Sequence, residues 1–80
     1  MDKSKYAVLG AGNGGQCISA YLSLKGYEVS LYDRFKNIIN PLKERGNIEL
    51  KGVSLNGIAQ IDCITTDIEE AVDGKDIILV

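Results

Sequence analysis

The sequence predicts an α/β protein in which short apolar strands alternate with amphipathic helices. Apolar stretches of four or five residues recur along the chain, a helical spacing follows the first of them, and glycines mark most of the boundaries. With 80 residues, of which 45% are hydrophobic and 25% charged, the composition is that of one small globular domain.

The first three elements form a strand–helix–strand unit. Residues 6–9 are continuously apolar, which is typical of a strand buried on both faces. From 14 to 25 the spacing is helical and places Gly15, Ile18, Ser19 and Leu22 on one face, which predicts a helix that packs through this face and ends at Gly26. Residues 28–32 alternate and are rich in strand formers, so they predict a second strand.

The middle of the chain predicts a short helix and a hairpin. Because a proline inside a helix removes a backbone hydrogen bond, we place Asn40 at the N-cap and Pro41 at the first position of a helix that ends at residue 45. Two alternating stretches, 48–52 and 53–57, meet at a glycine and predict a hairpin inserted before the next strand of the main sheet.

The last third of the chain predicts a strand, a helix and another strand. Residues 61–65 are the candidate third main strand. Thr66 and Glu69 match a capping box, in which a hydroxyl and a carboxylate three residues later cap the start of a helix. Residues 76–80 are almost wholly apolar and predict a buried fourth strand. Right-handed crossovers between four parallel strands predict the order 3-2-1-4 of a Rossmann-type, doubly wound sheet.

The strongest functional signal lies between the first strand and the first helix. The run Gly10-Ala11-Gly12-Asn13-Gly14-Gly15 contains the GxGxxG pattern at its first, third and sixth positions. In this context the first glycine permits a tight turn, the second lets a pyrophosphate approach the backbone, and the third lets the helix pack on the strand. The N–H groups at the helix N-terminus would then face the phosphates. Asn13 could bind a phosphate or only adopt an awkward turn, and the alternative for the whole run is an ordinary turn with surplus glycine.

Two charged residues after the second strand bear on the choice of cofactor. Asp33 lies 18 residues after Gly15, where a carboxylate can accept hydrogen bonds from the ribose hydroxyls of NAD. Arg34 could pair with a 2′-phosphate and leaves NADP open, but Asp33 would repel that phosphate, so we predict NAD. The alternative for Asp33 is a solvated aspartate at a strand end. Residues 1–80 would thus be the N-terminal half of an NAD(P)-binding domain, cut after its fourth main strand, with the substrate domain outside it.

The composition argues against several other classes. A net charge of −2, 6% aromatic residues and no Trp give little basis for nucleic-acid binding. The apolar runs are far shorter than the ~20 residues of a membrane span, and no signal-peptide pattern occurs, so we expect a cytoplasmic protein without a membrane partner. The chain has no His, and its two cysteines lack metal-ligand spacing, so we expect no metal site. We interpret Cys17 as a packing residue and the acidic residues 67–73 as a helix start.

The chain also resembles a known family. Residues 7–15 (AVLGAGNGG), 21–29 (YLSLKGYEV) and 65–71 (TTDIEEA) are similar to the N-terminal region of the opine (octopine/nopaline) dehydrogenases. Ketopantoate reductases and glycerol-3-phosphate dehydrogenases share much of this pattern. The resemblance implies an oxidoreductase that reduces the imine of an amino acid and a 2-oxo acid with NADH or NADPH.

The resemblance places the catalytic residues of such enzymes in a C-terminal helical domain, so no catalytic residue is expected within residues 1–80. It implies cofactor contacts only for the loop 10–15 and for Asp33 and Arg34. A small-molecule substrate bound outside this chain and a homodimer are further expectations. The alternatives are a nucleotide-sensing regulatory module of a transporter and an FAD-binding half-domain.

Overall fold

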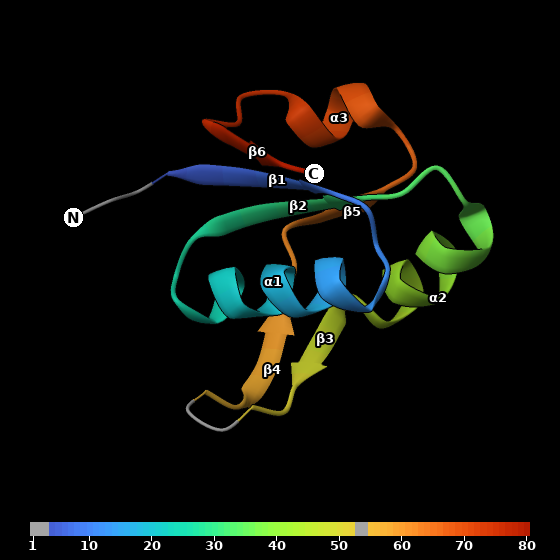
Figure 1. Cartoon of the computed structure of the whole chain (residues 1–80). Helices are drawn as coiled ribbons and strands as arrows, with labels where there is room; N and C mark the ends of the chain where they lie inside the picture. The colour runs from blue at the N-terminus through green and yellow to red at the C-terminus, as the bar shows by residue number, and fades with distance from the viewer. Residues whose placement is uncertain (1–3, 53–54) are drawn as a thin grey trace.

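The elements of the chain are taken from a computed structural model that describes residues 4–52 and 55–80. They are β1 (Lys5–Leu9), α1 (Asn13–Leu24), β2 (Glu28–Tyr32), α2 (Lys36–Arg45), β3 (Asn47–Leu50), β4 (Gly57–Gln60), β5 (Cys63–Thr65), α3 (Ile68–Val72) and β6 (Ile77–Leu79). Four strands form a parallel sheet in the order β5-β2-β1-β6. Helices α1 and α2 lie on one face of this sheet and α3 on the other, and the hairpin β3–β4 covers α1 on the side away from the sheet (Figure 1).

The predicted fold class and strand order are confirmed. Counting only the strands of the main sheet, the order is 3-2-1-4, and every neighbouring pair is parallel. The carboxyl ends of all four strands therefore lie along one edge. In open α/β sheets that edge, near the point where the strand order reverses, is where ligands bind.

The core lies between the sheet and α1 and α2 and extends beneath the hairpin. Its central side chains include Leu31 of β2 and Ile39 of α2, which are fully buried. The prediction that Ile18 is buried is wrong, since its side chain is 41% exposed. Ser19 and Leu22 of the same predicted face are buried, and the small Ser19 together with the buried Ala20 lets the helix lie close to the sheet.

The hairpin is confirmed, but its second arm lies later in the sequence than predicted. β3 and β4 are antiparallel, and the register partners Ile48 and Ala59 are both buried. The Ser23 hydroxyl of α1 donates to the carbonyl of Gln60 at 2.8 Å, which ties the hairpin to the helix. The returning arm is β4 rather than residues 53–57, of which 53 and 54 lie outside the described residues.

Helix α2 begins earlier than predicted. It starts at Lys36, so Pro41 lies inside the helix and not at its first position. The proline leaves one carbonyl of the preceding turn without its helical donor. Burial of Ile39 and Leu42 offsets this loss, which is why tertiary packing overrides the local signal. The helix ends as predicted at Gly46, which has φ +71°.

The last two elements also differ from the prediction in part. The N-cap of α3 is Asp67 and not Thr66, because the Asp67 carboxylate accepts hydrogen bonds from the N–H groups of Glu69 and Glu70. A carboxylate is well suited to this place because the helix dipole stabilises negative charge there. β6 lies at the edge of the sheet that the described residues form, and Ile78 is 48% exposed there, so the burial predicted for the fourth strand stays a prediction for the intact domain. Within the described parts of the chain, no helix combines the length and apolarity that crossing a bilayer requires.

Candidate functional site

The candidate site lies at the edge of the sheet where β1 and β2 end. Leu9 and Tyr32 are register partners in these parallel strands, so the loops that follow them leave the sheet side by side. The N–H of Gly10 donates to the carbonyl of Tyr32 at 2.7 Å, which continues the pairing into the loop. The structure thereby brings the predicted loop of residues 10–15 next to Asp33.

Two glycines of this loop are required by the fold, and two are not. Gly10 has φ +126°, a conformation that residues with a Cβ rarely adopt. A Cβ at Gly15 would overlap the carbonyl oxygen of Gly10, so only glycine lets α1 lie this close to the end of β1. At Gly12 and Gly14 a Cβ would meet nothing within 4 Å, and neither residue has a positive φ. Packing within the chain therefore does not explain why residues 12 and 14 lack side chains.

The start of α1 presents backbone N–H groups that lack acceptors. The first helical bond runs from the N–H of Gln16 to the carbonyl of Gly12 at 2.9 Å. Gly12 is the N-cap and provides no side-chain acceptor. No described residue accepts a hydrogen bond from the N–H of Asn13, Gly14 or Gly15. These groups lie at the positive end of the helix dipole beside an exposed turn, which is a favourable place for an anion.

Asn13 is the first residue of α1, and its side chain is exposed. Among residues 4–52 and 55–80, only glycines have a positive φ. The alternative that Asn13 serves only an awkward turn is therefore excluded, because its backbone is helical. Its side chain is free to reach a group bound at the helix N-terminus.

Asp33 joins the two loops of the site. One carboxylate oxygen accepts from the N–H of Ala11 and the other from the N–H of Phe35, each at 3.0 Å. The hydrogen bonds from Ala11 and then Phe35 lower the pKa of Asp33 below its usual value, and the nearby positive charge of Arg34 adds to the effect. Asp33 is therefore ionised at neutral pH. Each oxygen has a second lone pair, so the carboxylate can still accept a hydrogen bond from a ligand hydroxyl.

Arg34 and Phe35, which follow Asp33 in the chain, form a cation–π pair. The guanidinium carbon of Arg34 lies 4.7 Å from the centre of the Phe35 ring, and both side chains are exposed. An exposed aromatic ring and a guanidinium plane are groups on which a planar base can stack. Our sequence analysis missed Phe35, although an aromatic residue two positions after the strand-end acid is a signal that could have found it.

A hollow of ≈ 560 Å³ opens on the other side of the loop, between α1 and β6. Its volume is within the range of small-molecule sites. Because β6 and β2 flank β1 on opposite sides, the loop separates this hollow from Asp33. The hollow is lined by Val8, Leu9, Gly10, Gly12, Gly14, Gly15, Ile18, Leu79 and Val80.

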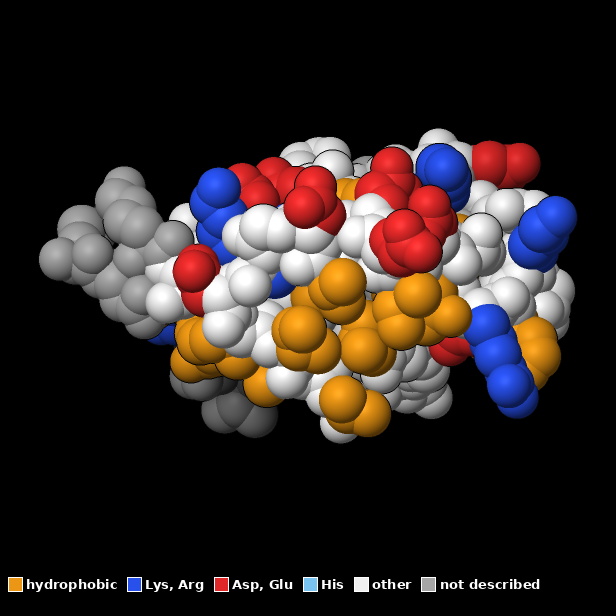
Figure 2. All heavy atoms as spheres, turned by 90° about the horizontal axis from the view of Figure 1, so that it is seen from above, with side chains coloured by type: hydrophobic (Ala, Val, Ile, Leu, Met, Phe, Trp, Pro, Cys, Tyr) orange, Lys and Arg blue, Asp and Glu red, His pale blue; other side chains and the backbone are white. Residues whose placement is uncertain are grey.

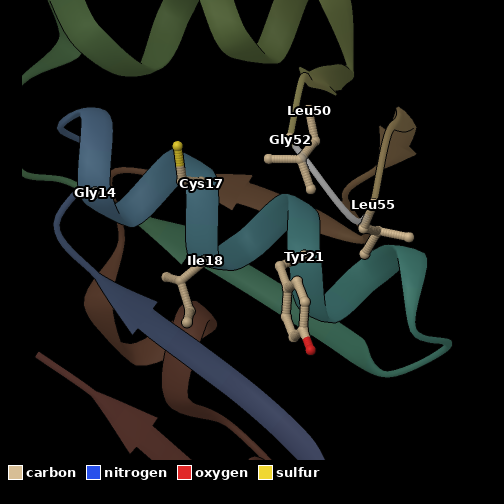
Figure 3. Close-up of a pocket in the computed structure, with 7 residues that line it drawn as sticks. All are labelled: Gly14, Cys17, Ile18, Tyr21, Leu50, Gly52 and Leu55. Carbon is tan, nitrogen blue, oxygen red and sulfur yellow. The ribbon is translucent and has the colours of Figure 1, made fainter.

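A second, apolar groove of ≈ 370 Å³ lies between α1 and the hairpin. Figure 3 shows Ile18 and Tyr21 on the helix and Leu50 and Leu55 on the hairpin segment along this groove. Cys17 also lines the groove and is exposed, so the interpretation of Cys17 as a packing residue is wrong. None of the described residues that line the groove is Asp, Glu, Lys or Arg, so these residues offer no charged side chain to a phosphate or a carboxylate.

Acidic side chains gather on the face of the molecule that carries α3, across the sheet from α1 and the hairpin (Figure 1 and Figure 2). Figure 2, which looks onto the α3 side, shows several Asp and Glu side chains close together. This placement follows the sequence, in which residues 47–80 have seven Asp and Glu against two Lys and Arg. In the parts of the chain that the structure describes, His, Cys, Asp and Glu form no group of three that could hold a metal ion.

The parallel sheet, the bare turn before α1 and the acid after β2 together define the N-terminal part of a Rossmann-type dinucleotide-binding domain. Comparison with known proteins agrees with this class. Residues 5–80 match the family described as NAD-dependent glycerol-3-phosphate dehydrogenase N-terminus, and the chain belongs to that family.

An opine dehydrogenase of Arthrobacter sp. (strain 1C) is 42% identical to this chain over 80 residues. The match covers 100% of the chain but 22% of the relative's length. The predicted similarity to opine dehydrogenases and the related glycerol-3-phosphate enzymes is thereby confirmed. The chain is an N-terminal NAD-binding region of this dehydrogenase family.

Proposed function

We propose that this chain binds the ADP part of NAD through the loop of residues 10–15 and Asp33. The observation that carries the proposal is the set of N–H groups of residues 13–15, which have no acceptor among residues 4–52 and 55–80. They lie beside two glycines that packing with these residues does not require. The diphosphate accepts hydrogen bonds from these groups, and the side chain of Asn13 adds a further contact. The adenosine ribose then lies against Asp33 and the adenine against the surface formed by Arg34 and Phe35.

Preference for NAD over NADP follows from the charge on Asp33. The ionised carboxylate accepts hydrogen bonds from both ribose hydroxyls, whereas it would repel a 2′-phosphate. The position of Arg34 supports this preference. Its guanidinium lies over the Phe35 ring, as part of the surface proposed for adenine and not as a partner of a 2′-phosphate. The nicotinamide half extends across the loop towards the hollow beside β6.

We further propose that the intact protein is an opine-type dehydrogenase that reduces an imine of an amino acid and a 2-oxo acid. The identity with the opine dehydrogenase supports this activity. Bound NADH would supply the hydride, and the residues of this chain would hold and orient it, while catalytic residues would come from outside residues 1–80. A cytoplasmic location and a homodimer stay predictions.

Oxidation of glycerol-3-phosphate is the second candidate activity, because the matching family carries that name. One assay distinguishes the two candidate activities. The intact protein is expected to oxidise NADH with a mixture of an amino acid and a 2-oxo acid, and to leave NAD unchanged with glycerol-3-phosphate. The reverse result would favour the second candidate.

Replacement of Gly12 by valine tests the binding site. The position is open, so Gly12→Val is expected to stay folded and keep its circular dichroism spectrum, with a slightly lower melting temperature because valine is a poorer N-cap than glycine. The valine side chain would occupy the space proposed for the diphosphate, and NADH affinity in a fluorescence titration should fall at least 100-fold. Glu49→Val, which adds an exposed valine on β3, is the matched control and should bind like the wild type. A folded Gly12→Val protein that retains NADH affinity would contradict the proposal.

A further inference from the structure

We propose that Gln16 is a positioning residue for the nucleotide loop and that it acts together with Asp33 on the backbone of Ala11. The inference rests on the function proposed above and assigns a role to a residue outside the glycine pattern. The N–H of Ala11 donates to a carboxylate oxygen of Asp33 at 3.0 Å. The side-chain amide of Gln16 donates to the carbonyl of the same residue at 2.9 Å. Ala11 is thus held from two sides, by β2 through Asp33 and by α1 through Gln16.

Gln16 also holds the next carbonyl of the loop. Its backbone N–H donates to the carbonyl of Gly12 at 2.9 Å, while its side chain holds that of Ala11. A trans peptide is planar, and its N–H and C=O point in opposite directions. Fixing these two carbonyls towards Gln16 therefore directs the N–H groups of Gly12 and Asn13 away from it. No described residue accepts from either N–H, so both are available to a ligand.

The surrounding residues explain why this loop needs such a support. Ala11 lies between Gly10 and Gly12, which have the widest range of backbone conformations available to any residue. The side chain of Ala11 is fully buried, and Gln16 is half-buried beside it. A loop ordered before the ligand arrives loses less conformational entropy on binding, so the two hydrogen bonds raise affinity without touching the ligand.

Two substitutions in the intact protein test the role of Gln16, with ADP-ribose as the probe in titration calorimetry. Gln16→Met keeps the length of the side chain but cannot donate a hydrogen bond. At every pH from 5 to 8 its affinity for ADP-ribose should be roughly three- to tenfold lower than that of the wild type. Gln16→Glu should bind still more weakly at pH 8, because its carboxylate faces the carbonyl of Ala11. Its affinity should rise as the pH falls from 8 to 5, because the fraction of the carboxyl that is protonated and can donate grows. Asp33 stays ionised over this range, so the wild type should show no such rise.

Amide hydrogen exchange without nucleotide separates this inference from the proposed function. The N–H of Ala11 should exchange several-fold faster in Gln16→Met than in the wild type. If the wild type binds no ADP-ribose but the N–H of Ala11 still exchanges faster in Gln16→Met, Gln16 positions the loop and the proposed function is contradicted. Wild-type affinity in Gln16→Met, or a Gln16→Glu variant whose affinity does not change with pH, would overturn the positioning role.

Discussion

Single residues of the loop differ in what they contribute. Gly10 and Gly15 serve the fold, the first through its positive φ and the second through its contact with the Gly10 carbonyl. Gly12 and Gly14 leave open surface in front of the helix. The GxGxxG pattern already predicted a role in the fold for positions 10 and 15 and an open approach at position 12. It predicted nothing for Gly14, whose open surroundings depend on which atoms lie near its absent Cβ.

Asp33 is the residue whose role the structure extends most. Its distance from the glycines in the sequence predicted that it lies near the loop. That it also bonds Ala11 and Phe35 could not be predicted, because those bonds depend on how two separate loops meet. The carboxylate therefore stabilises the site as well as facing the proposed ribose.

The pH dependence of stability tests this second role of Asp33. Because the folded-state pKa is lowered, the unfolded chain binds the proton more readily as the pH falls. The stabilisation is complete above the unfolded value of about 4 and is lost as the pH falls through the lowered pKa. Asp33→Asn should melt at a lower temperature than the wild type at pH 6, and the difference should shrink below about pH 4. If the two proteins differed in melting temperature by the same amount at pH 6 and pH 2.5, the ionised Asp33 carboxylate would not be the source of the stabilisation.

Whole elements show where tertiary packing overrides local signals. α2 extends through Pro41 because Ile39, before the proline, and Leu42, after it, are both buried in the core. The local signals located α1 and β2 closely, and they predicted the hairpin, although its returning arm is β4 rather than residues 53–57. At α3 the capping-box pattern predicted the hydroxyl of Thr66 as the cap, whereas in the structure the carboxylate one residue later, on Asp67, accepts the hydrogen bonds.

Replacement of Pro41 by alanine tests the interior position of the proline. Pro41→Ala restores the missing helical N–H at an exposed position of α2. Proline in a helix interior costs about 3 kcal/mol, and its rigidity in the unfolded chain returns up to about 1 kcal/mol. The free energy of unfolding in urea should therefore rise by about 2 kcal/mol. Asn40→Ala, at the exposed neighbouring position, is the control and should change it by less than about 0.5 kcal/mol. A less stable Pro41→Ala protein would mean that the ring itself stabilises the helix.

At the scale of the whole molecule, α1 lies between two layers. The main sheet packs on one side of the helix and the hairpin β3–β4 on the other (Figure 1). This arrangement orients the helix N-terminus towards the carboxyl edge of the sheet. The loop amides, Asp33 and the hollow beside β6 are therefore held by the same core.

Two isoleucines allow a matched test of this core. Ile39 is 1% exposed in the core, whereas Ile58 is 61% exposed on the hairpin. Ile39→Ala should lower the free energy of unfolding by about 2–5 kcal/mol, because it removes buried methyl groups and leaves a cavity. Ile58→Ala should change it by less than about 0.5 kcal/mol. Similar losses for both variants in urea unfolding would contradict the placement of the core.

The sequence by itself determined the order of strands and helices, the parallel sheet and the glycine turn with its following acid. These features depend on contacts or spacings within a few residues, or on a crossover handedness that is nearly universal. Only the tertiary structure decided the helical position of Pro41, the exposure of Ile18 and Cys17, and the hydrogen bonds that join Ala11 to Asp33 and Gln16. Each of these features depends on contacts with residues far away in the sequence, so the residues next to it in the sequence do not determine it.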